Sequence, residues 1–397
     1  MLQKIGDGKI NALKHLLLGI TLRLQNIKPL LDMQHHKLPL MSRCLGTLAL
    51  SLLLITGCKK DEFVCLDGLV VYEAESSADG IDLSDYVIIA CEGGFTRGNA
   101  SIDLYNPSTG DLLPNAFADQ AGYVLGDILQ DVYWTNNDLI LVVNNSQKIE
   151  ILDPNTLTPK RTIAGFTSPR YAHVNDEGGI YVSDLFSRQF IRSDAQSGCI
   201  DAAIDLYGWT EYIFPYRSNG IAVLHRSVYG QGSPISEVLL LSKDLELRDN
   251  IALPEDPIQM IEGSEGHIFY VLSIGNVTNE VAGQIVEVNL LDKTTREIIR
   301  FNEDRPNRIA FDKNSNTLYF NLASDIFKIV GDTPPSLAWT TTAQAIYGLS
   351  VLNNGDVIVS DAKDFVANGA IEHYDSSGNL IRIVDVGYVP SEVVDHP

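Results

Sequence analysis

Aromatic, arginine and amide side chains recur in this sequence beside short apolar segments, and their types are those that could hold a ligand. Rigid aromatic rings next to a few directional hydrogen-bonding groups are typical of sites for bulky small molecules. The candidates lie in loops that border β-branched segments. We expect ten of them to form one ligand-binding surface: Phe95, Arg97, Asn99, Asn144, Asn145, Arg170, Tyr171, Trp209, Glu211 and Tyr229.

Each candidate also has a structural interpretation. The aromatic side chains could fill gaps between repeated units. Asn144 and Asn145 could cap the loop backbone, since short amide side chains hydrogen-bond nearby peptide groups. Arg170 could form a structural ion pair with Glu211. For the ten residues together, the sequence favours binding.

An enzymatic site has weaker support. A metal-dependent lactonase would need oxygen ligands that converge on one cation. The candidates for that role are Glu92, Asn144, Asp184 and Asp361. Asp184 and Asp361, however, recur at one position of the repeat, as a consensus residue would. The sequence contains no Gly-x-Ser-x-Gly motif, which argues against a Ser–His hydrolase. His225 is the candidate base of a lyase, but nothing in the sequence places a carboxylate beside it. We therefore expect no catalytic residue, no metal and no cofactor.

The elements that must position these residues are predicted to be strands. After residue 60, short β-branched and aromatic runs are bounded by Gly, Pro, Asn and Asp. The pattern repeats about every 40 to 50 residues with four strands per repeat, which is typical of a β-propeller. The repeats cover residues 127–166, 168–209, 210–254, 256–304, 305–342 and 345–387.

The opening repeat is incomplete. Residues 86–118 supply a second, third and fourth strand but no clear first, whereas a short strand at 391–394 has no repeat after it. If that tail completes the opening repeat, the ring closes and no edge is left unpaired. We predict an all-β propeller of seven four-stranded blades, with six or eight as alternatives. The loops between second and third strands and those between blades should share one face, where the ten candidates would gather. The opposite face should carry plain Asp/Asn/Gly hairpins.

The N-terminal segment predicts where the protein is located in the cell. An apolar run, Leu45–Ile55, follows Arg43 and is too short to span a bilayer as a helix. The Leu-Leu-Ile-Thr-Gly-Cys that ends at Cys58 resembles a bacterial lipobox, which implies that Cys58 is lipidated. An ordinary signal peptide with an incidental cysteine is the alternative. We expect 1–57 to be an upstream extension plus signal peptide with its start at Met41, 58–85 a lipidated tether, and 86–397 the propeller.

Charge and cysteine content narrow the choice of partners. The chain has a formal charge of −22, and its first 57 residues hold seven basic and two acidic residues, which leaves −27 for the rest. Such a charge argues against binding to nucleic acid or anionic head groups, so membrane attachment would depend on acyl chains. Cys65, Cys91 and Cys199 lie after the anchor and permit at most one disulfide.

Several phrases carry a family resemblance. They are Glu-Gly-Gly-Phe (92–95), Val-Val-Asn-Asn-Ser (142–146), Ser-Pro-Arg-Tyr (168–171), Tyr-Val-Ser-Asp (181–184) and Gly-Trp-Thr-Glu (208–211). They resemble seven-bladed YVTN-type (YncE-like) propeller lipoproteins, which occur on outer membranes with TonB-dependent transporters. Cys91 departs from the family, which often has Asn there, and the later blades are divergent.

The resemblance implies a function as well as a fold. Some members of this family capture cobalamin, so the expected protein is an outer-membrane surface lipoprotein that captures a ligand, a corrinoid being the candidate, for a TonB-dependent receptor. A cell-surface scaffold for another protein is the first alternative. A metal-dependent lactonase or lyase is the second.

Overall fold

The computed structural model describes residues 70–71 and 83–396, except for 176, 195, 218–219 and 229–233. The proposed lipidation site Cys58, the predicted signal peptide and most of the predicted tether lie outside these residues, and so does Tyr229. Among the described helices, none is long and apolar enough to cross a membrane.

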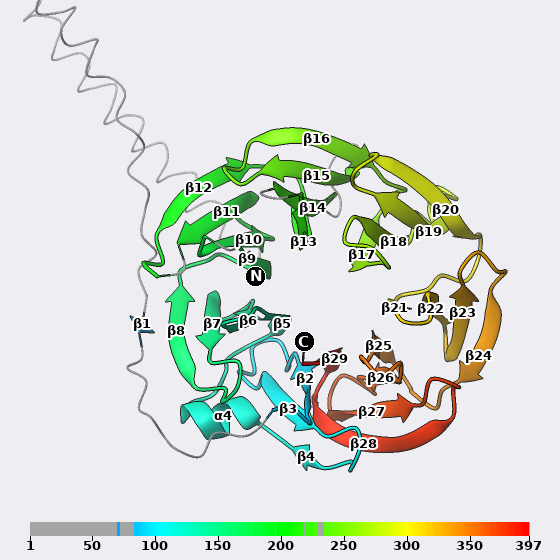
Figure 1. Ribbon diagram of the computed structural model, residues 1–397, viewed down its shortest axis with the longest axis horizontal. Helices are drawn as coiled ribbons and strands as arrows, with labels where there is room; N and C mark the ends of the chain where they lie inside the picture. Colours follow the sequence, from blue (N-terminus) through cyan, green and yellow to red (C-terminus); the bar gives the residue numbers. More distant parts are fainter. Residues whose placement is uncertain are drawn as a thin grey trace, which may run out of the picture. The chain divides into compact units, whose positions relative to one another are not determined.

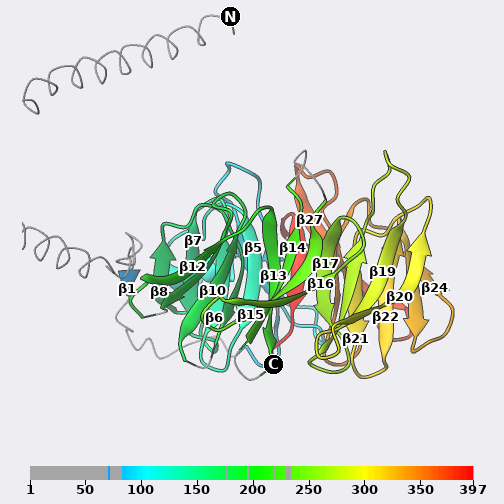
Figure 2. The same ribbon diagram turned by 90° about the horizontal axis from the view of Figure 1, so that it is seen from above.

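Seven antiparallel sheets surround one axis and form the blades of a β-propeller (Figure 1). Viewed from the side, the strands of all blades run across the thickness of the ring (Figure 2). Each sheet has four strands in meander order, and one sheet has a fifth strand at its outer edge. This architecture confirms the predicted fold and the predicted number of blades.

Each blade begins with a strand at the axis of the ring and ends with a strand at its rim. Blade 1 contains β29 (Pro390–Val394), β2 (Val87–Cys91), β3 (Ser101–Tyr105) and β4 (Leu112–Leu113). Blade 2 contains β5 (Leu129–Trp134), β6 (Leu139–Val143), β7 (Lys148–Leu152), β8 (Pro159–Ala164) and the added β1 (Val70–Val71). Blade 3 contains β9 (Pro169–Val174), β10 (Gly179–Asp184), β11 (Gln189–Asp194) and β12 (Ile200–Asp205).

The remaining blades follow the same order. Blade 4 contains β13 (Trp209–Tyr216), β14 (Gly220–Arg226), β15 (Ser236–Ser242) and β16 (Leu247–Ala252). Blade 5 contains β17 (Pro257–Glu262), β18 (Ile268–Ser273), β19 (Gly283–Asn289) and β20 (Thr294–Phe301). Blade 6 contains β21 (Ile309–Asp312), β22 (Thr317–Leu322), β23 (Asp325–Val330) and β24 (Ser336–Thr340). Blade 7 contains β25 (Ile346–Val351), β26 (Val357–Asp361), β27 (Asn368–Tyr374) and β28 (Leu380–Tyr388).

The C-terminal strand closes the ring, as predicted. β29 pairs antiparallel with β2, and Val393 lies opposite Ile89. A Cβ atom at Gly348 of β25 would lie only 1.9 Å from the carbonyl oxygen of Ser391, so any side chain there would collide with the closing strand. A glycine is therefore required where blade 7 meets β29. Closure pairs the strand edge that an open array would expose.

Apolar side chains between neighbouring blades form the core. β2, β6 and β26 are buried along their whole length. A strand covered on both faces is apolar throughout rather than alternating, and this explains sequences such as Leu139-Ile-Leu-Val-Val143.

The hairpins that join the third and fourth strands of the blades depend on local hydrogen bonds. In the turn after β27, Asp375 Oδ1 accepts bonds from the backbone N–H groups of Ser377 at 2.9 Å and Asn379 at 2.8 Å. Asp153 and Asp194 hold the corresponding turns of blades 2 and 3 in a similar way. These turns confirm the predicted Asp/Asn hairpins.

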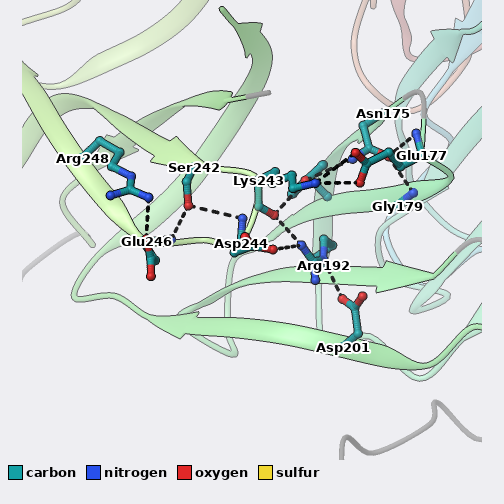
Figure 3. A network of polar contacts seen from close by, with 11 residues as sticks. Asn175, Glu177, Gly179, Arg192, Asp201, Ser242, Lys243, Asp244, Glu246 and Arg248 are labelled. Carbon is teal, nitrogen blue, oxygen red and sulfur yellow. Dashed lines mark hydrogen bonds and ion pairs between the residues drawn. The ribbon is translucent and has the colours of Figure 1, made fainter. Parts of the chain in front are cut away.

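A polar network links blades 3 and 4 on the face of the ring that carries these hairpins (Figure 3). Arg192 of β11 donates to Asp201 at 2.8 Å, to Asp244 at 2.9 Å and to the carbonyl of Lys243 at 2.6 Å. Lys243 in turn lies 3.0 Å from Glu177. The two acceptor carboxylates of Arg192 are 42% and 64% exposed, so water competes for most of this network.

Some features were not predicted from the sequence. A short helix, α4 (Ala116–Ala121), lies between β4 and β5, and its Phe117 is buried. Fewer than two turns are too few to show a helical period in the sequence. β13 begins at Trp209, one residue before the predicted repeat. Cys91 is a buried free thiol, and Cys199 is disulfide-bonded.

Candidate functional site

A cavity of about 870 Å³ follows the axis of the ring. It is lined by the inner strands of all seven blades and by the loops at one end of them. Sites for small molecules usually measure about 300–1,000 Å³, so the cavity is large enough for a substantial ligand. We call its end beside the loops between second and third strands the mouth.

β-bulges in the inner strands bring side chains to the mouth. The pairing with the second strand shifts register at Gln130, at Arg170–Tyr171, at Glu211–Tyr212 and at Tyr347. Similar shifts occur at Ile258 and Ser391. All of these residues except Glu211 line the cavity. A bulge re-aims a side chain and is frequent beside functional sites, so the repeat itself builds the lining of the mouth.

Arg170 links three blades at the mouth. Its Nε donates to Glu211 Oε2 at 2.8 Å, and its Nη1 donates to Gln130. Burial alone would lower the pKa of Arg170, but the charge and hydrogen bond of Glu211, together with the electrostatic effects of Tyr171 and Tyr212, raise that pKa overall. Glu211 is only 4% exposed. The pair is thus the structural link that the sequence offered as an alternative to a binding role.

A second polar group lies across the mouth. The hydroxyl of Tyr347 donates to Glu92 at 3.0 Å, and the guanidinium of Arg308 lies 4.9 Å from the centre of the Tyr347 ring. Burial raises the pKa of Glu92, while the Tyr347 hydrogen bond and the charges of Arg170 and Arg308 partly offset this shift. The carboxyl group of Glu92 therefore lies within electrostatic range of two guanidiniums, those of Arg170 and Arg308.

Two tyrosines form an aromatic wall. The rings of Tyr171 and Tyr212 stack with centroids 4.2 Å apart and an interplanar angle of 29°. Burial raises the pKa of Tyr212 to about 12 and holds the pKa of Tyr171 well above its usual value, so both hydroxyls stay protonated at neutral pH. They can serve as hydrogen-bond donors to a ligand.

Two carboxyl groups lie below this wall. Asp131 of β5 and Glu392 of β29 both line the cavity. Burial raises the pKa of each, and the charge of Asp131 raises that of Glu392 further. Asp131 accepts a hydrogen bond from the backbone N–H of Ala172 at 3.2 Å. Like charges in an enclosed space disfavour double ionisation.

The far end of the cavity carries more apolar side chains than the mouth, with His173 and Glu262 among them. Its lining includes Tyr133, Phe214, Pro215, Ile261 and Phe311, which follow the bulges along the inner strands. The cavity therefore becomes more apolar from the mouth to its other end. A ligand that enters by the mouth meets directional polar groups first.

The structure brings part of the predicted surface together. Phe95, Asn144, Arg170 and Tyr171 line the cavity, and Glu211 joins them through its ion pair with Arg170. Asn144 also donates to Ser168 at 2.9 Å and to the Pro169 carbonyl at 2.8 Å, which fixes the loop of the next blade.

Four other predicted residues lie outside the lining. The guanidinium of Arg97 lies 5.2 Å from the centre of the Tyr388 ring. Asn99 accepts the Gly94 N–H within its own loop at 2.8 Å, and Asn145 binds the carboxylate of Asp127. Trp209 is half-buried at the start of β13. Asn99 and Asn145 are thus engaged in contacts within and between loops, and the bond to loop backbone that the capping alternative required is made by Asn144 instead.

The enzyme candidates are engaged in structural contacts. Asp184 accepts from the N–H groups of Thr167 and Ser168, and Asp361 accepts from that of Ala345, so both hold the loops between blades. This equivalence confirms the interpretation as a consensus residue. Contrary to the interpretation of the sequence, His225 does have a carboxylate beside it: Nδ1 lies 2.9 Å from Glu237.

Metal ligands are not grouped in the described part of the chain. No three His, Cys, Asp or Glu side chains there lie close enough together to hold an ion. Glu92, Asp184 and Asp361 therefore do not form one such group.

Sequence reasoning missed several lining residues. Gln130, Asp131, Tyr212, Arg308 and Glu392 were not proposed as ligand-binding residues. A usable pattern exists: polar residues occupy the second or third position of the first strand in most repeats, as in Gln130-Asp131 and Ser391-Glu392. An alignment of first strands, instead of loops, would have pointed to Gln130, Asp131 and Glu392, but not to Tyr212, at the fourth position of β13, or to Arg308, which precedes β21.

Comparisons with known proteins support the fold. No protein-family model matches the sequence, and no curated protein sequence matches it. Among solved structures, a quinoprotein alcohol dehydrogenase-like protein from Bacteroides thetaiotaomicron VPI-5482 is similar, with a TM-score of 0.63, 16% identity and 79% of each chain covered. A 6-phosphogluconolactonase-like protein from Bacteroides fragilis NCTC 9343 has a TM-score of 0.57 and 13% identity, over 82% of this chain and 100% of that one. At such identities the likeness concerns the propeller fold alone.

Proposed function

We propose that this protein binds a small molecule at the mouth of its central cavity without altering it chemically. The observation that carries the proposal is the cavity of about 870 Å³, whose mouth combines Phe95, the stacked Tyr171 and Tyr212, and the polar groups of Asn144 and Arg308. A bulky, partly apolar ligand would pack on the rings, accept hydrogen bonds from the Arg308 guanidinium and a tyrosine hydroxyl, and donate to the amide oxygen of Asn144, whose two N–H groups are bonded to Ser168 and Pro169.

Rigidity of the site favours tight binding. Gln130, Arg170 and Glu211 are held to one another across three blades, and Tyr347 is bonded to Glu92. Side chains that are fixed before binding lose little conformational entropy when the ligand arrives. Capture at low ligand concentration is consistent with such a preformed site.

The proposal extends to location and partner. The lipobox-like segment that ends at Cys58 supports attachment to the outer membrane by acyl chains. The ligand, for which a corrinoid is the first candidate because of the sequence resemblance, would then pass to a TonB-dependent receptor. The acidic surface would help to select that receptor.

Titration of the purified protein with a panel of three compounds, cyanocobalamin, haem and a ferric siderophore, tests this function by calorimetry. We expect binding of at least one compound in the micromolar range or tighter. Lack of binding by all three would reject ligand capture of this kind and favour the scaffold alternative.

A matched pair of variants locates the binding. Phe95 and Phe186 are 71% and 66% exposed, and each lies in the loop between the second and third strands of its blade, but only Phe95 lines the cavity. We expect Phe95→Ala to weaken binding about tenfold, since it removes one aromatic contact, and Phe186→Ala to leave it unchanged. Equal effects of the two substitutions would contradict binding at the mouth.

A further inference from the structure

The charges around the cavity are not balanced. Four carboxyl groups lie at or near its upper part, those of Glu92, Glu211, Asp131 and Glu392, together with the guanidiniums of Arg170 and Arg308. Arg170 is paired with Glu211, and Glu92 feels the charges of both arginines. When ionised, Asp131 is partly offset by the charge of Arg170, whereas the only charged group that acts on Glu392 among the described residues is Asp131, which repels it.

Glu392 is the less satisfied member of this pair. Within the described part of the chain, no group donates a hydrogen bond to its carboxyl group, and the main interactions it feels are burial and repulsion from Asp131. Its side chain is open to the space inside the ring yet enclosed by the surrounding blades. Because Glu392 is exposed to the space within the cavity, a cationic group that enters can reach its carboxylate and offset the repulsion from Asp131.

Aromatic rings border the same space. Tyr212 lies close enough to Glu392 for the carboxylate charge to raise its pKa, and Tyr212 stacks on Tyr171. Two carboxylates beside aromatic faces suit an organic cation, since the rings attract positive charge as well as apolar groups. A calcium ion needs six to eight oxygen ligands, and no group of three metal-binding side chains exists among the described residues.

We propose that Asp131 and Glu392 form a subsite in the central cavity for the ammonium group of a ligand. This subsite rests on the proposed function and specifies the class of molecule bound: an amine with an apolar body. The ammonium group lies between the two carboxylates, and the apolar body packs on Tyr171 and Tyr212.

Proton release is the first consequence. Burial and mutual repulsion raise the pKa of both carboxyl groups, so the empty pair retains a proton near neutral pH. Arg170 opposes this shift at Asp131. The other titratable residues of the lining are Glu92, Tyr133, Tyr171, His173, Tyr212, Glu262, Arg308 and Tyr347. A bound ammonium group favours the doubly ionised pair, and binding should therefore release up to about one proton and strengthen as the pH rises.

Calorimetry with benzylammonium, benzyl alcohol and benzoate tests the subsite. The three probes share a ring and differ in charge. We expect benzylammonium to bind at least about tenfold more tightly than the other two, with proton release measured from the heat in two buffers of different ionisation enthalpy. Equal binding of the neutral alcohol, or binding without proton release, would overturn the proposal.

Variants provide the second arm. Asp131→Asn and Glu392→Gln should each weaken benzylammonium binding about tenfold, whereas Glu177→Gln, which removes a charge on the opposite face, should not. Unchanged affinity for benzylammonium in both Asp131→Asn and Glu392→Gln would contradict the subsite. Calcium ions that bind tightly and displace benzylammonium would reassign the pair to a metal. If a variant fails to fold, the proton release of the unmodified protein still decides.

The subsite and the proposed function can fail separately. A panel compound whose binding is lost in Phe95→Ala but unaffected by Glu392→Gln would leave ligand capture intact and reject the subsite. Conversely, benzylammonium binding together with no binding of the three panel compounds would support the subsite and reject the proposed ligands.

Discussion

The two faces of the ring are built by different chemistry. On the face opposite the mouth, side chains such as Asp375 bond to backbone groups two to four residues away. At the mouth, Arg170 is bonded to Glu211 and Gln130, which lie about forty positions away in the sequence. Tyr347 of blade 7 is bonded to Glu92 of the neighbouring blade 1, 255 positions away. Short-range contacts thus determine the turns of the hairpins, and the contacts between blades on that face are exposed, as in the network of Arg192, whereas buried contacts between blades determine the candidate site.

Two arginines sharpen this comparison most strongly. Arg170 at the mouth pairs with Glu211, whose side chain is 5% exposed, while Arg192 on the other face pairs with carboxylates that are 42% and 64% exposed. We expect Arg170→Ala to lower the free energy of unfolding by about 3 kcal/mol, because it leaves a buried carboxylate unpaired. Arg192→Ala should cost about 1 kcal/mol or less.

Urea denaturation of both variants measures the difference. Equal losses of stability would show that burial does not separate the two faces as described. A conservative Arg170→Lys variant should recover part of the loss, since a lysine keeps the charge but not the two-sided hydrogen bonding.

Loss of a side chain that holds a local turn should lower the free energy of unfolding less than Arg170→Ala does, and it should not affect ligand binding. Asp375→Ala removes two side-chain hydrogen bonds to backbone N–H groups in an exposed hairpin. We expect a loss of about 1 kcal/mol in the free energy of unfolding and unchanged affinity for any ligand of the mouth. Altered ligand affinity in this variant would mean that the two faces are coupled.

The smallest effect depends on pH. The raised pKa values of Asp131 and Glu392 mean that these groups bind protons more tightly in the folded protein. Their contribution to stability is complete below the ordinary carboxyl pKa of about 4 and is lost as the pH rises through the folded-state values. Glu392→Gln cannot ionise and avoids this loss.

Thermal denaturation of this variant and of the unmodified protein gives the measurement. We expect the melting temperature of Glu392→Gln to exceed that of the unmodified protein by about 2 °C at about pH 9 and to show no such gain at about pH 5. A gain of the same size at both pH values would reflect packing rather than ionisation.

The same division explains what could be predicted from the sequence. Turn sequences such as Asp375-Ser-Ser-Gly378 and buried runs such as Leu139–Val143 depend on neighbours in the chain, so strands, repeats and the closing role of 391–394 were predicted correctly. The short helix α4 and the added strand β1 lie outside the repeat and were missed.

The site was only partly predictable for a physical reason. Phe95, Asn144, Arg170 and Tyr171 lie in or beside loops, where polar and aromatic residues are conspicuous. Bulges instead direct residues of the inner strands, such as Gln130, into the cavity. A bulge depends on pairing with the next strand, and a single sequence does not reveal it.

A crystal structure of the protein with the panel compound that binds most tightly is the most direct test of ligand capture. We predict that the ligand occupies the mouth of the central cavity, in contact with Phe95, Tyr171 and Tyr212. A ligand bound on the outer strands or among the hairpins of the opposite face, with the cavity unoccupied, would contradict this function.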